Sequence, residues 1–390
     1  KNYIKIIDIE ELSEIHAIEY IRRNLNNPPP PGENDDVKML ANLFGRIPIA
    51  LSQSTGHINS KDLTIPIYIE EYNKRKHGIY ELSEWLDTSV YSNRKSLYSL
   101  LILTLKELSP QAKKILNLCI YLDQYSIPKY LFENSVARSP AEYRQALASL
   151  KSYSLITDQN SNFNIYRIVQ EIVKHAIDPN DLEYLREATR VVNGEMIDTS
   201  KEWDEHKITR QNKPMLEHAI SLIRHYQNIE TSLTDKLATA KLHTNCGNSY
   251  LAMGQLNKAL EHYNAAENIL PVNTVNSNSK QAINLVLIEI HKGRGKIYEL
   301  SLQHEQSFNE YTKALDLKDP SYREDDIEIL RIKYELANIN CKGKHYQKAI
   351  EEYETLLLKI SGMKEVDIIL DSRFSETKVK KLIKEITATN

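Results

Sequence analysis

Small and apolar residues recur in the C-terminal half of the chain at spacings that predict pairs of antiparallel helices. The clearest window, residues 240–271, has seven such positions, which are Gly247, Tyr250, Gly254, Ala259, Tyr263, Ala266 and Pro271. Gly247 and Ala259 let two helices cross closely, and the two tyrosines fill the space beside the crossing. Gly254 permits a tight turn between the helices, and Pro271 ends the second one.

Two further windows keep these offsets. The matching positions are Gly295, Tyr298, Ser307, Tyr311 and Ala314 in one, and Ala337, Ala349 and Tyr353 in the other, with Gly343 one place early. The spacing resembles that of tetratricopeptide repeats (TPRs), helix–turn–helix units that stack into a solenoid. The positions of Ala259, Ser307 and Ala349 lie further apart than one standard repeat, as in kinesin-light-chain-like repeats. The Asn/Ser-rich stretch 272–280 is expected to be a loop that absorbs part of the excess.

The N-terminal segment predicts a strand followed by helices. Residues 3–9 have the isoleucine-rich pattern of a strand, and Ser13 is a suitable N-cap for a helix bearing Ile15, Ile18, Ile21 and Leu25. Residues 26–36 contain consecutive prolines and are expected to form a loop. A helix then ends near Gly45, and another begins at Pro48 with Ala50, Leu51 and Ile58 facing inward.

Residues 93–177 predict helices and one β-hairpin in the order of a winged helix. The first helix carries Tyr98, Leu101, Leu105 and Leu108. Ser109 before Pro110 begins the second helix, and the capping box Ser139-Pro140-Ala141-Glu142 begins the third. Residues 155–157 and 163–165 pair around the polar stretch DQNSN, and RIVQEIVKHAI forms the last helix.

Several segments, taken in order, resemble the C-terminal half of NB-ARC-type STAND nucleotide switches. They are LSEIHAIEYI, LANLFGRIPIAL, LKELSPQAKKILNLCIYL with SIPKYLF, LASLKSYSLI with FNIYRIVQEIVK, and KPMLEHAISLIRHY at 213–226. The resemblance covers nearly all of residues 1–360 and implies a mainly α fold: a helical domain and a winged helix with one small β-hairpin, followed by a TPR-type α-solenoid. The expected domains are a small helical domain at 1–90, a winged helix at 91–180, bridging helices at 181–235 and the TPR solenoid at 236–390.

The resemblance also implies two nucleotide-contacting positions in a complete switch. Gly45-Arg46-Ile47-Pro48 stands where that family has its GLPL motif, so Pro48 is implied to contact adenine. Tyr166-Arg167-Ile168-Val169-Gln170 stands where bacterial members have His-Arg-Leu-Val-Gln, so Tyr166 replaces the histidine that is thought to touch the diphosphate. The alternatives are that Pro48 only starts a helix and that Tyr166 only packs at the end of the hairpin.

The sequence has no signature of catalysis. No G-x-x-x-x-G-K-[ST] phosphate loop occurs, and Gly293-Arg294-Gly295-Lys296 lacks that spacing. The sequence also lacks the G-x-S-x-G and Cys/His signatures of nucleophilic enzymes, and its histidines do not have the spacing of zinc ligands. We therefore expect no enzymatic activity, no metal and no cofactor in this chain. ADP or ATP is implied only for a longer parent protein whose phosphate-binding half lies upstream.

Composition and charge narrow the partners. The net charge is −3, so no bulk field draws the chain to nucleic acid or to a membrane. The third helix of the predicted winged helix offers Arg144 and Lys151 beside Glu142, which is too sparse for phosphate contacts along DNA. Cys119, Cys246 and Cys341 lie far apart and are expected to be reduced thiols of a cytoplasmic protein. No apolar run is long enough to span a membrane.

The first helix of each repeat is expected to line one groove. Six outward positions should converge there, namely Lys241, Asn248, Lys292, Lys296, Arg331 and Asn338. Their positive balance favours a protein ligand, in particular an acidic or extended peptide. The sequence thus predicts the sensor and regulatory half of a STAND-type switch, which binds a partner through its repeats and relays nucleotide state through the winged helix. The alternative is a free-standing TPR adaptor without nucleotide dependence.

Overall fold

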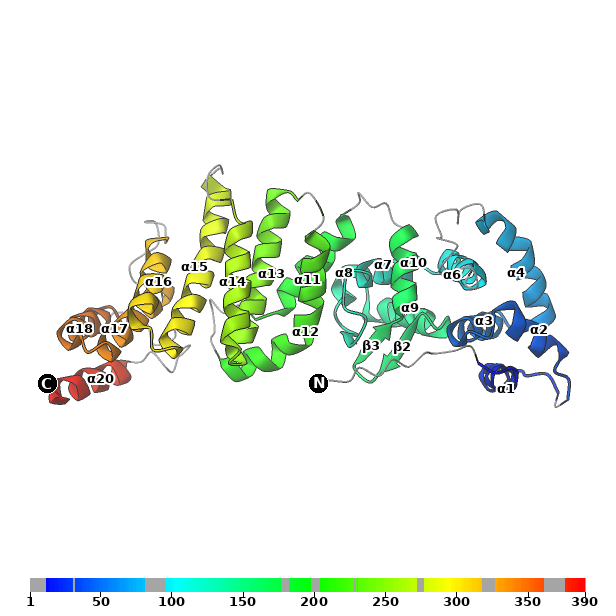
Figure 1. Ribbon diagram of the computed structural model, residues 1–390, viewed down its shortest axis with the longest axis horizontal. Helices are drawn as coiled ribbons and strands as arrows, with labels where there is room; N and C mark the ends of the chain where they lie inside the picture. Colours follow the sequence, from blue (N-terminus) through cyan, green and yellow to red (C-terminus); the bar gives the residue numbers. More distant parts are fainter. Residues whose placement is uncertain are drawn as a thin grey trace, which may run out of the picture. The chain divides into compact units, whose positions relative to one another are not determined.

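The computed structural model describes residues 12–30, 32–80, 95–176, 182–197, 204–227, 229, 231–271, 277–317, 327–360 and 376–389 (Figure 1). These residues are mainly helical, with one small antiparallel sheet, as the sequence predicts. The chain divides into two compact units, residues 1–184 and 185–390. The strand expected at 3–9 lies outside the described residues, and the finer division into four domains stays a prediction.

The first unit begins with four helices, which are α1 (Glu14–Asn24), α2 (Asp35–Leu43), α3 (Pro48–Ser60) and α4 (Ile65–Tyr80). The side chain of Ser13 caps α1 as expected, because its Oγ accepts a hydrogen bond of 3.3 Å from the amide of His16. Gly45 and Arg46 both have positive φ, and the amide of Arg46 donates back to the carbonyl of Ala41. This left-handed pair ends α2 and lets the chain turn into α3 at Pro48.

The second half of this unit combines helices with the sheet. Its elements are α6 (Lys95–Glu107), α7 (Pro110–Cys119), β1 (Ile127–Pro128), α8 (Glu133–Val136), α9 (Pro140–Ser152), β2 (Ile156–Gln159), β3 (Asn162–Ile165) and α10 (Arg167–Ala176). The expected hairpin is β2–β3, and β1 adds a third strand on the other side of β3, with Ile127 opposite Phe163. Strand β1 was not predicted from the sequence, because a two-residue strand carries no alternating pattern.

Both predicted N-caps of this region are present, although one differs in detail. Ser109 Oγ accepts from the amide of Ala112 at 3.2 Å, and Ser139 Oγ accepts from the amide of Glu142 at 3.3 Å. The Glu142 carboxylate, however, accepts from the amide of Arg138 at 2.8 Å. The capping box is therefore incomplete, because the acid reaches the residue before the N-cap.

The second unit contains the predicted helix pairs. Its helices are α11 (Glu183–Glu195), α12 (Glu205–Tyr226), α13 (Leu233–Ala252), α14 (Leu256–Ile269), α15 (Ser277–Leu300), α16 (His304–Asp316), α17 (Ile327–Lys342), α18 (Tyr346–Ile360) and α20 (Glu376–Thr389). We define repeats 1, 2 and 3 as α13–α14, α15–α16 and α17–α18. Helix α15 begins at Ser277, so residues 277–280 of the expected loop are helical, and residues 272–276 lie outside the described residues. Helix α20 packs Val379 and Ile386 into the core of repeat 3, beside Tyr353, Leu356 and Ile360.

The small residues of the repeat pattern lie where the two helices of a pair cross closely. Ala259, Ser307 and Ala349 are fully buried, and Ser307 Oγ also donates a hydrogen bond of 2.7 Å to the carbonyl of Gly295. A side chain at Gly295 would collide with the ring of Tyr311, because its Cβ would lie 2.7 Å from Cε2. The second helix of each pair therefore crosses the first where small residues leave room for an aromatic ring.

The turns inside the three repeats share one backbone geometry. Gly254, Leu302 and Lys344 occupy the same place in their turns, with φ of 72°, 59° and 64°. In each turn the amide of this residue and the next amide donate to consecutive carbonyls at the end of the preceding helix. Only repeat 1 has glycine there, so repeats 2 and 3 hold a non-glycine residue in the left-handed region.

Candidate functional site

The first helices of repeats 2 and 3 carry four of the predicted groove residues, and these are engaged in contacts within the protein. The ammonium group of Lys292 lies 2.7 Å from Glu289 and 3.2 Å from Glu328, and its side chain is 19% exposed. Lys296 lies 3.0 Å from Glu299, which also contacts Lys342 of α17. Two ion pairs, Lys292–Glu328 and Glu299–Lys342, therefore join α15 to α17. The expectation that Lys292 and Lys296 face solvent is wrong.

The positive charge of the lysines on α15 and α17 is balanced by glutamates that were not among the predicted groove residues. Burial alone would lower the pKa of Lys292, but Glu289 and Glu328 outweigh it and hold that pKa above its usual value. Burial likewise opposes ionisation of Glu299, yet Lys342 and Lys296 keep its pKa below the usual value. Three lysines of α15 and α17, Lys292, Lys296 and Lys342, are paired with carboxylates on the same two helices, which are Glu289, Glu299 and Glu328. The i,i+3 spacing of Glu289 with Lys292, and of Lys296 with Glu299, was the missed signal.

Each of the two asparagines of the predicted groove joins the two helices of its own repeat. Asn248 is 2% exposed and accepts a hydrogen bond of 2.6 Å from the hydroxyl of Tyr263. Asn338 is half-buried, accepts from the hydroxyl of Tyr353 at 2.5 Å and donates to Glu335 at 3.1 Å. Repeats 1 and 3 thus contain the same kind of internal contact: in each repeat, an asparagine of the first helix is hydrogen-bonded to a tyrosine of the second helix.

Lys241 and Arg331 complete the predicted set. Lys241 lies on α13 and is exposed, whereas Arg331 lies on α17 and is half-buried. The structure therefore places the six residues on the first helices of three successive repeats. It gives only Lys241 the solvent exposure that the prediction assumed for the lysines.

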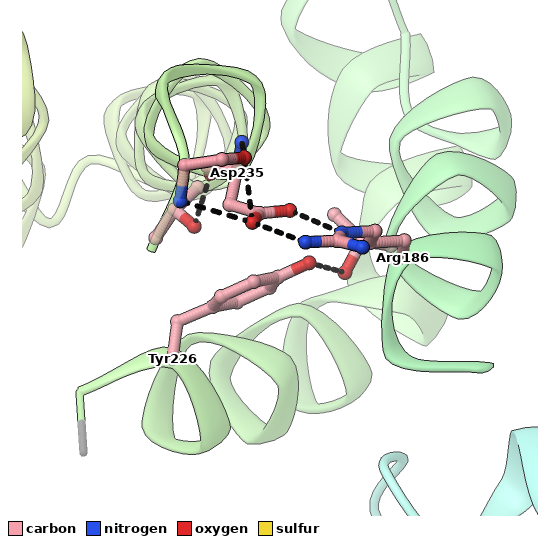
Figure 2. A network of polar contacts seen from close by, with 6 residues as sticks. Arg186, Tyr226 and Asp235 are labelled. Carbon is pink, nitrogen blue, oxygen red and sulfur yellow. Dashed lines mark hydrogen bonds and ion pairs between the residues drawn. The ribbon is translucent and has the colours of Figure 1, made fainter. Parts of the chain in front are cut away.

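A polar network fastens the helices before the repeats to repeat 1 (Figure 2). The guanidinium group of Arg186 on α11 donates from Nε and Nη2 to the two carboxylate oxygens of Asp235 on α13, at 2.8 and 2.9 Å. Asp235 also accepts from the amide and hydroxyl of Ser232, so it forms the capping box that starts α13. The hydrogen bonds from the Arg186 guanidinium are the main reason why the pKa of this buried carboxyl lies below its usual range, and Ser232 acts in the same direction.

Further contacts extend this network along α13. Asn193 of α11 donates to the carbonyl of Ala238 at 3.1 Å and accepts from Asn245 at 2.9 Å. Asn212 of α12 is fully buried, donates to Ser249 at 3.1 Å and accepts from the amide of Ile197 at 2.8 Å. Helices α11, α12 and α13 are therefore joined by specific side-chain contacts over most of the length of α13. This network was not predicted from the sequence.

The nucleotide-contacting positions implied by the family resemblance lie on separate elements of the first unit. Pro48 is exposed and is the first residue of α3. Tyr166 is 38% exposed, and its carbonyl accepts from the amides of Val169 and Gln170 at the start of α10. Gln170, quoted above only as part of a motif, donates through Nε2 to the carbonyls of Cys119 and Leu122 at 2.8 and 3.0 Å. It thereby anchors α10 to the end of α7.

A buried histidine and a half-buried histidine of repeat 1 lie close together. His243 and His262 pair between α13 and α14, with 3.1 Å between their Nδ1 atoms. In the part of the chain that the structure describes, no group of three or more His, Cys, Asp or Glu side chains is arranged to hold a metal ion. The same part of the chain contains no helix with the length and apolar character that crossing a membrane requires.

Comparisons with known proteins give three results. A family model described as a domain of unknown function, DUF7779, matches residues 103–182. A nucleotide-binding leucine-rich repeat (NLR)-like protein of Hyaloscypha variabilis is 24% identical over 270 residues, which are 66% of this chain and 26% of that protein. The crystal structure of a Signal Transduction ATPase with Numerous Domains (STAND) protein with a tetratricopeptide repeat sensor, from Pyrococcus horikoshii, matches 97% of this chain and 58% of its own, with 13% identity and a TM-score of 0.32.

The similarity to the NLR-like protein confirms the resemblance to the C-terminal region of STAND and NB-ARC proteins. This chain spans about a quarter of the length of that relative.

Proposed function

We propose that this chain is the sensor and regulatory region of a STAND-type signalling protein, and that its repeats bind a partner protein. The observation that carries the proposal is the stack of three helix pairs whose first helices, α13, α15 and α17, hold the six predicted groove residues. Stacked pairs of this kind present their first helices as one continuous surface, to which residues from separate repeats contribute. The proposed location is cytoplasmic.

The ion pairs of α15 and α17 change the chemistry proposed for that surface. Because Lys292 and Lys296 are already paired with glutamates, an acidic peptide has to displace those glutamates before it can reach the lysines. A partner that offers both signs of charge, or that contacts the exposed Lys241, fits this face better than a purely acidic one. A nucleic acid would require a denser basic stripe.

The network at Arg186 supports the proposed relay. Helices α11, α12 and α13 are bonded side by side, so a displacement of repeat 1 is transmitted to α11, which begins where the two compact units divide. In the proposal, residues 91–180 act as the winged helix that passes this movement to a nucleotide-binding half, where ADP or ATP is bound. Pro48 and Tyr166 are the proposed contacts to that nucleotide in the longer protein. The chain itself is proposed to bind no nucleotide and to catalyse no reaction.

Partner binding is tested with a photo-cross-linking amino acid placed at Lys241 in the full-length protein, in the cells that make it. The matched control carries the same residue at Lys384, which is exposed on α20. We expect the Lys241 position to capture a protein that the Lys384 position does not, and Arg186→Met to leave that capture intact. Equal capture at both positions contradicts the assignment of the face.

The choice between a switch and a free-standing adaptor is tested separately. Calorimetry with ATP and ADP on this chain should give no micromolar binding, because nucleotide affinity depends on charge-assisted bonds to the phosphates. A sequence upstream of Lys1 that encodes a phosphate-binding loop within about 150–200 residues, the scale of one domain, supports the switch. An upstream sequence without such a loop favours the adaptor.

A further inference from the structure

The turn of repeat 2 is unusual in both conformation and exposure. Leu302 has a φ of 59°, a region that disfavours a side chain with Cβ and that repeat 1 fills with Gly254. Leu302 is also 78% exposed, and Leu300 in the same turn is 52% exposed. Folding alone would favour glycine or a polar residue here. A strained conformation that persists with an exposed apolar side chain points to a use other than stability.

A surface cavity of about 860 Å³ lies next to this turn in the chain, between the start of α16 and the α17–α18 turn. Its apolar side is formed by Phe308, Ile339 and Tyr346. The polar residues around it are His304, Glu305, Asn340, Lys344, His345, Gln347 and Lys348. Its lining comes from the start of α16, the end of α17 and the α17–α18 turn, and it includes none of the six predicted groove residues of α13, α15 and α17.

The lysines of this cavity differ from those of the first-helix face. Within the described part of the chain, neither Lys344 nor Lys348 has a carboxylate partner, whereas Lys292 and Lys296 both do. The ammonium group of Lys348 lies 4.6 Å from the centre of the Phe308 ring, which holds a cation beside an apolar surface. Lys344 is, after Leu302, the second non-glycine residue with a left-handed backbone in a repeat turn, and its side chain is exposed.

We propose that this cavity and the adjoining leucines form a second docking site, which binds an acidic segment with large apolar side chains from a partner protein. The carboxylates of the segment pair with Lys344 and Lys348, and its apolar side chains pack against Phe308, Tyr346 and Leu302. Charge complementarity selects an acidic segment, because two unpaired lysines face a single glutamate, Glu305. The exposed leucines require apolar side chains beside those acids. The site does not depend on partner binding at the first-helix face proposed above.

Selection from a random dodecapeptide library, displayed against the full chain, tests the site while the natural partner is still unidentified. We expect the enriched peptides to combine Asp or Glu with Leu, Ile or Phe. Fluorescence anisotropy with a labelled peptide of the enriched consensus should show at least a tenfold loss of affinity for Lys344→Glu/Lys348→Glu. The control Lys213→Glu/Lys384→Glu alters the net charge equally, at exposed positions on α12 and α20, and should bind within twofold of the original chain.

Leu302→Gly separates binding from structural support. Glycine removes both the strain and the exposed side chain, so this variant should unfold at a higher denaturant concentration and yet bind the peptide at least fivefold more weakly. A purely structural role predicts no loss of binding. The proposal is overturned by a library that yields no enriched peptide, by peptides without acidic and apolar residues together, by equal binding of the two double variants, or by binding of a single-stranded oligonucleotide instead.

Discussion

Tyr263 of repeat 1 packs against Gly293 of repeat 2 so closely that a Cβ on Gly293 would lie 2.3 Å from the ring Cζ. On its other side the ring excludes a Cβ at Gly247, which would lie 2.7 Å from Cε1. The hydroxyl of Tyr263 donates to Asn248, so this fully buried side chain connects α13, α14 and α15. The sequence pattern assigned Gly247 and Tyr263 to one repeat and gave Gly293 no role.

Gly293→Ala is expected to destabilise the protein. The new methyl group meets a ring that has no room to move, and overpacking of this kind costs about 1–3 kcal/mol. The free energy of urea unfolding measures the effect. The matched control is Gly194→Ala on α11, where a Cβ would have no atom within 4 Å. That change should stabilise by about 0.4–1 kcal/mol, because alanine restricts the unfolded chain. Equal effects of the two changes would show that Tyr263 does not occupy the space beside Gly293.

Arg186→Met is expected to destabilise the joint between the bridging helices and repeat 1. It removes two charge-assisted hydrogen bonds from Asp235, whose carboxylate is 1% exposed, at a cost of about 2–3 kcal/mol. The control is Arg167→Met, which breaks an exposed i,i+4 pair with Glu171 and should cost less than about 0.5 kcal/mol. Chemical denaturation at pH 7 compares the two.

The pair of Arg186 and Asp235 should also make the stability of the protein depend on pH in the acid range. Because the folded-state pKa of Asp235 is lowered from 3.8, its contribution to stability is present above about pH 4 and is lost as the pH falls through the lowered pKa. The free energy of unfolding, measured between pH 5 and pH 2, should therefore fall less for Arg186→Met than for the original chain. The difference should be of the same order as the stability that Arg186→Met removes at pH 7. An identical loss in both proteins contradicts a dominant role for Arg186.

His243 should make the repeats sensitive to a milder acid range. Burial, and to a smaller extent the neighbouring His262, lowers the pKa of His243 from 6.5 to about 4. The ring of His243 is therefore neutral in the folded protein at pH 7. The unfolded chain takes up this proton at a higher pH, so stability falls as the pH drops from about 6.5 towards 4. His243→Gln should reduce that slope, while His16→Gln, at an exposed position on α1, should leave it unchanged. Stability measured at half-unit intervals of pH distinguishes the two variants.

Charge reversal should destabilise the protein at one lysine of the first-helix face and leave its stability nearly unchanged at another. Lys292→Glu places a third carboxylate beside Glu289 and Glu328 in a half-buried position, and should cost about 3 kcal/mol or more. Lys241→Glu changes an exposed residue and should leave the free energy of unfolding within about 0.5 kcal/mol. Thermal unfolding of both variants checks this. Lys241 is therefore the suitable position for binding experiments, since a loss of binding there does not follow from unfolding.

The elements that could be predicted from the sequence are those whose signal is local. The cap at Ser13, the left-handed turn at Gly254 and the small position Ala259 each act within a few residues, and the structure has all three. Contacts between helices distant in the chain could not be predicted in this way. The sequence around Asp235 indicates only a helix cap. The contact with Arg186 arises because α11 packs against α13.

The candidate site shows the same division. The sequence indicated which helix of each pair holds the six groove residues, because that follows from the helical period. Local spacing could indicate the pairs Glu289–Lys292 and Lys296–Glu299 within α15, but not the ion pairs between repeats, because Glu328 and Lys342 reach α15 from another repeat. A count of lysines along one helix therefore overestimated the positive charge of the surface.

Helix α20, which covers the core of repeat 3 with Val379 and Ile386, has a consequence for assembly. A stack of helix pairs is open-ended by construction, because each pair offers its neighbour an apolar side on which another pair can be added. Here α11 and α12 occupy that side of repeat 1, and α20 lies against repeat 3. Among the described residues, these sides of repeats 1 and 3 are thereby covered by helices of the same chain, so neither offers its apolar side to a helix pair of a second copy.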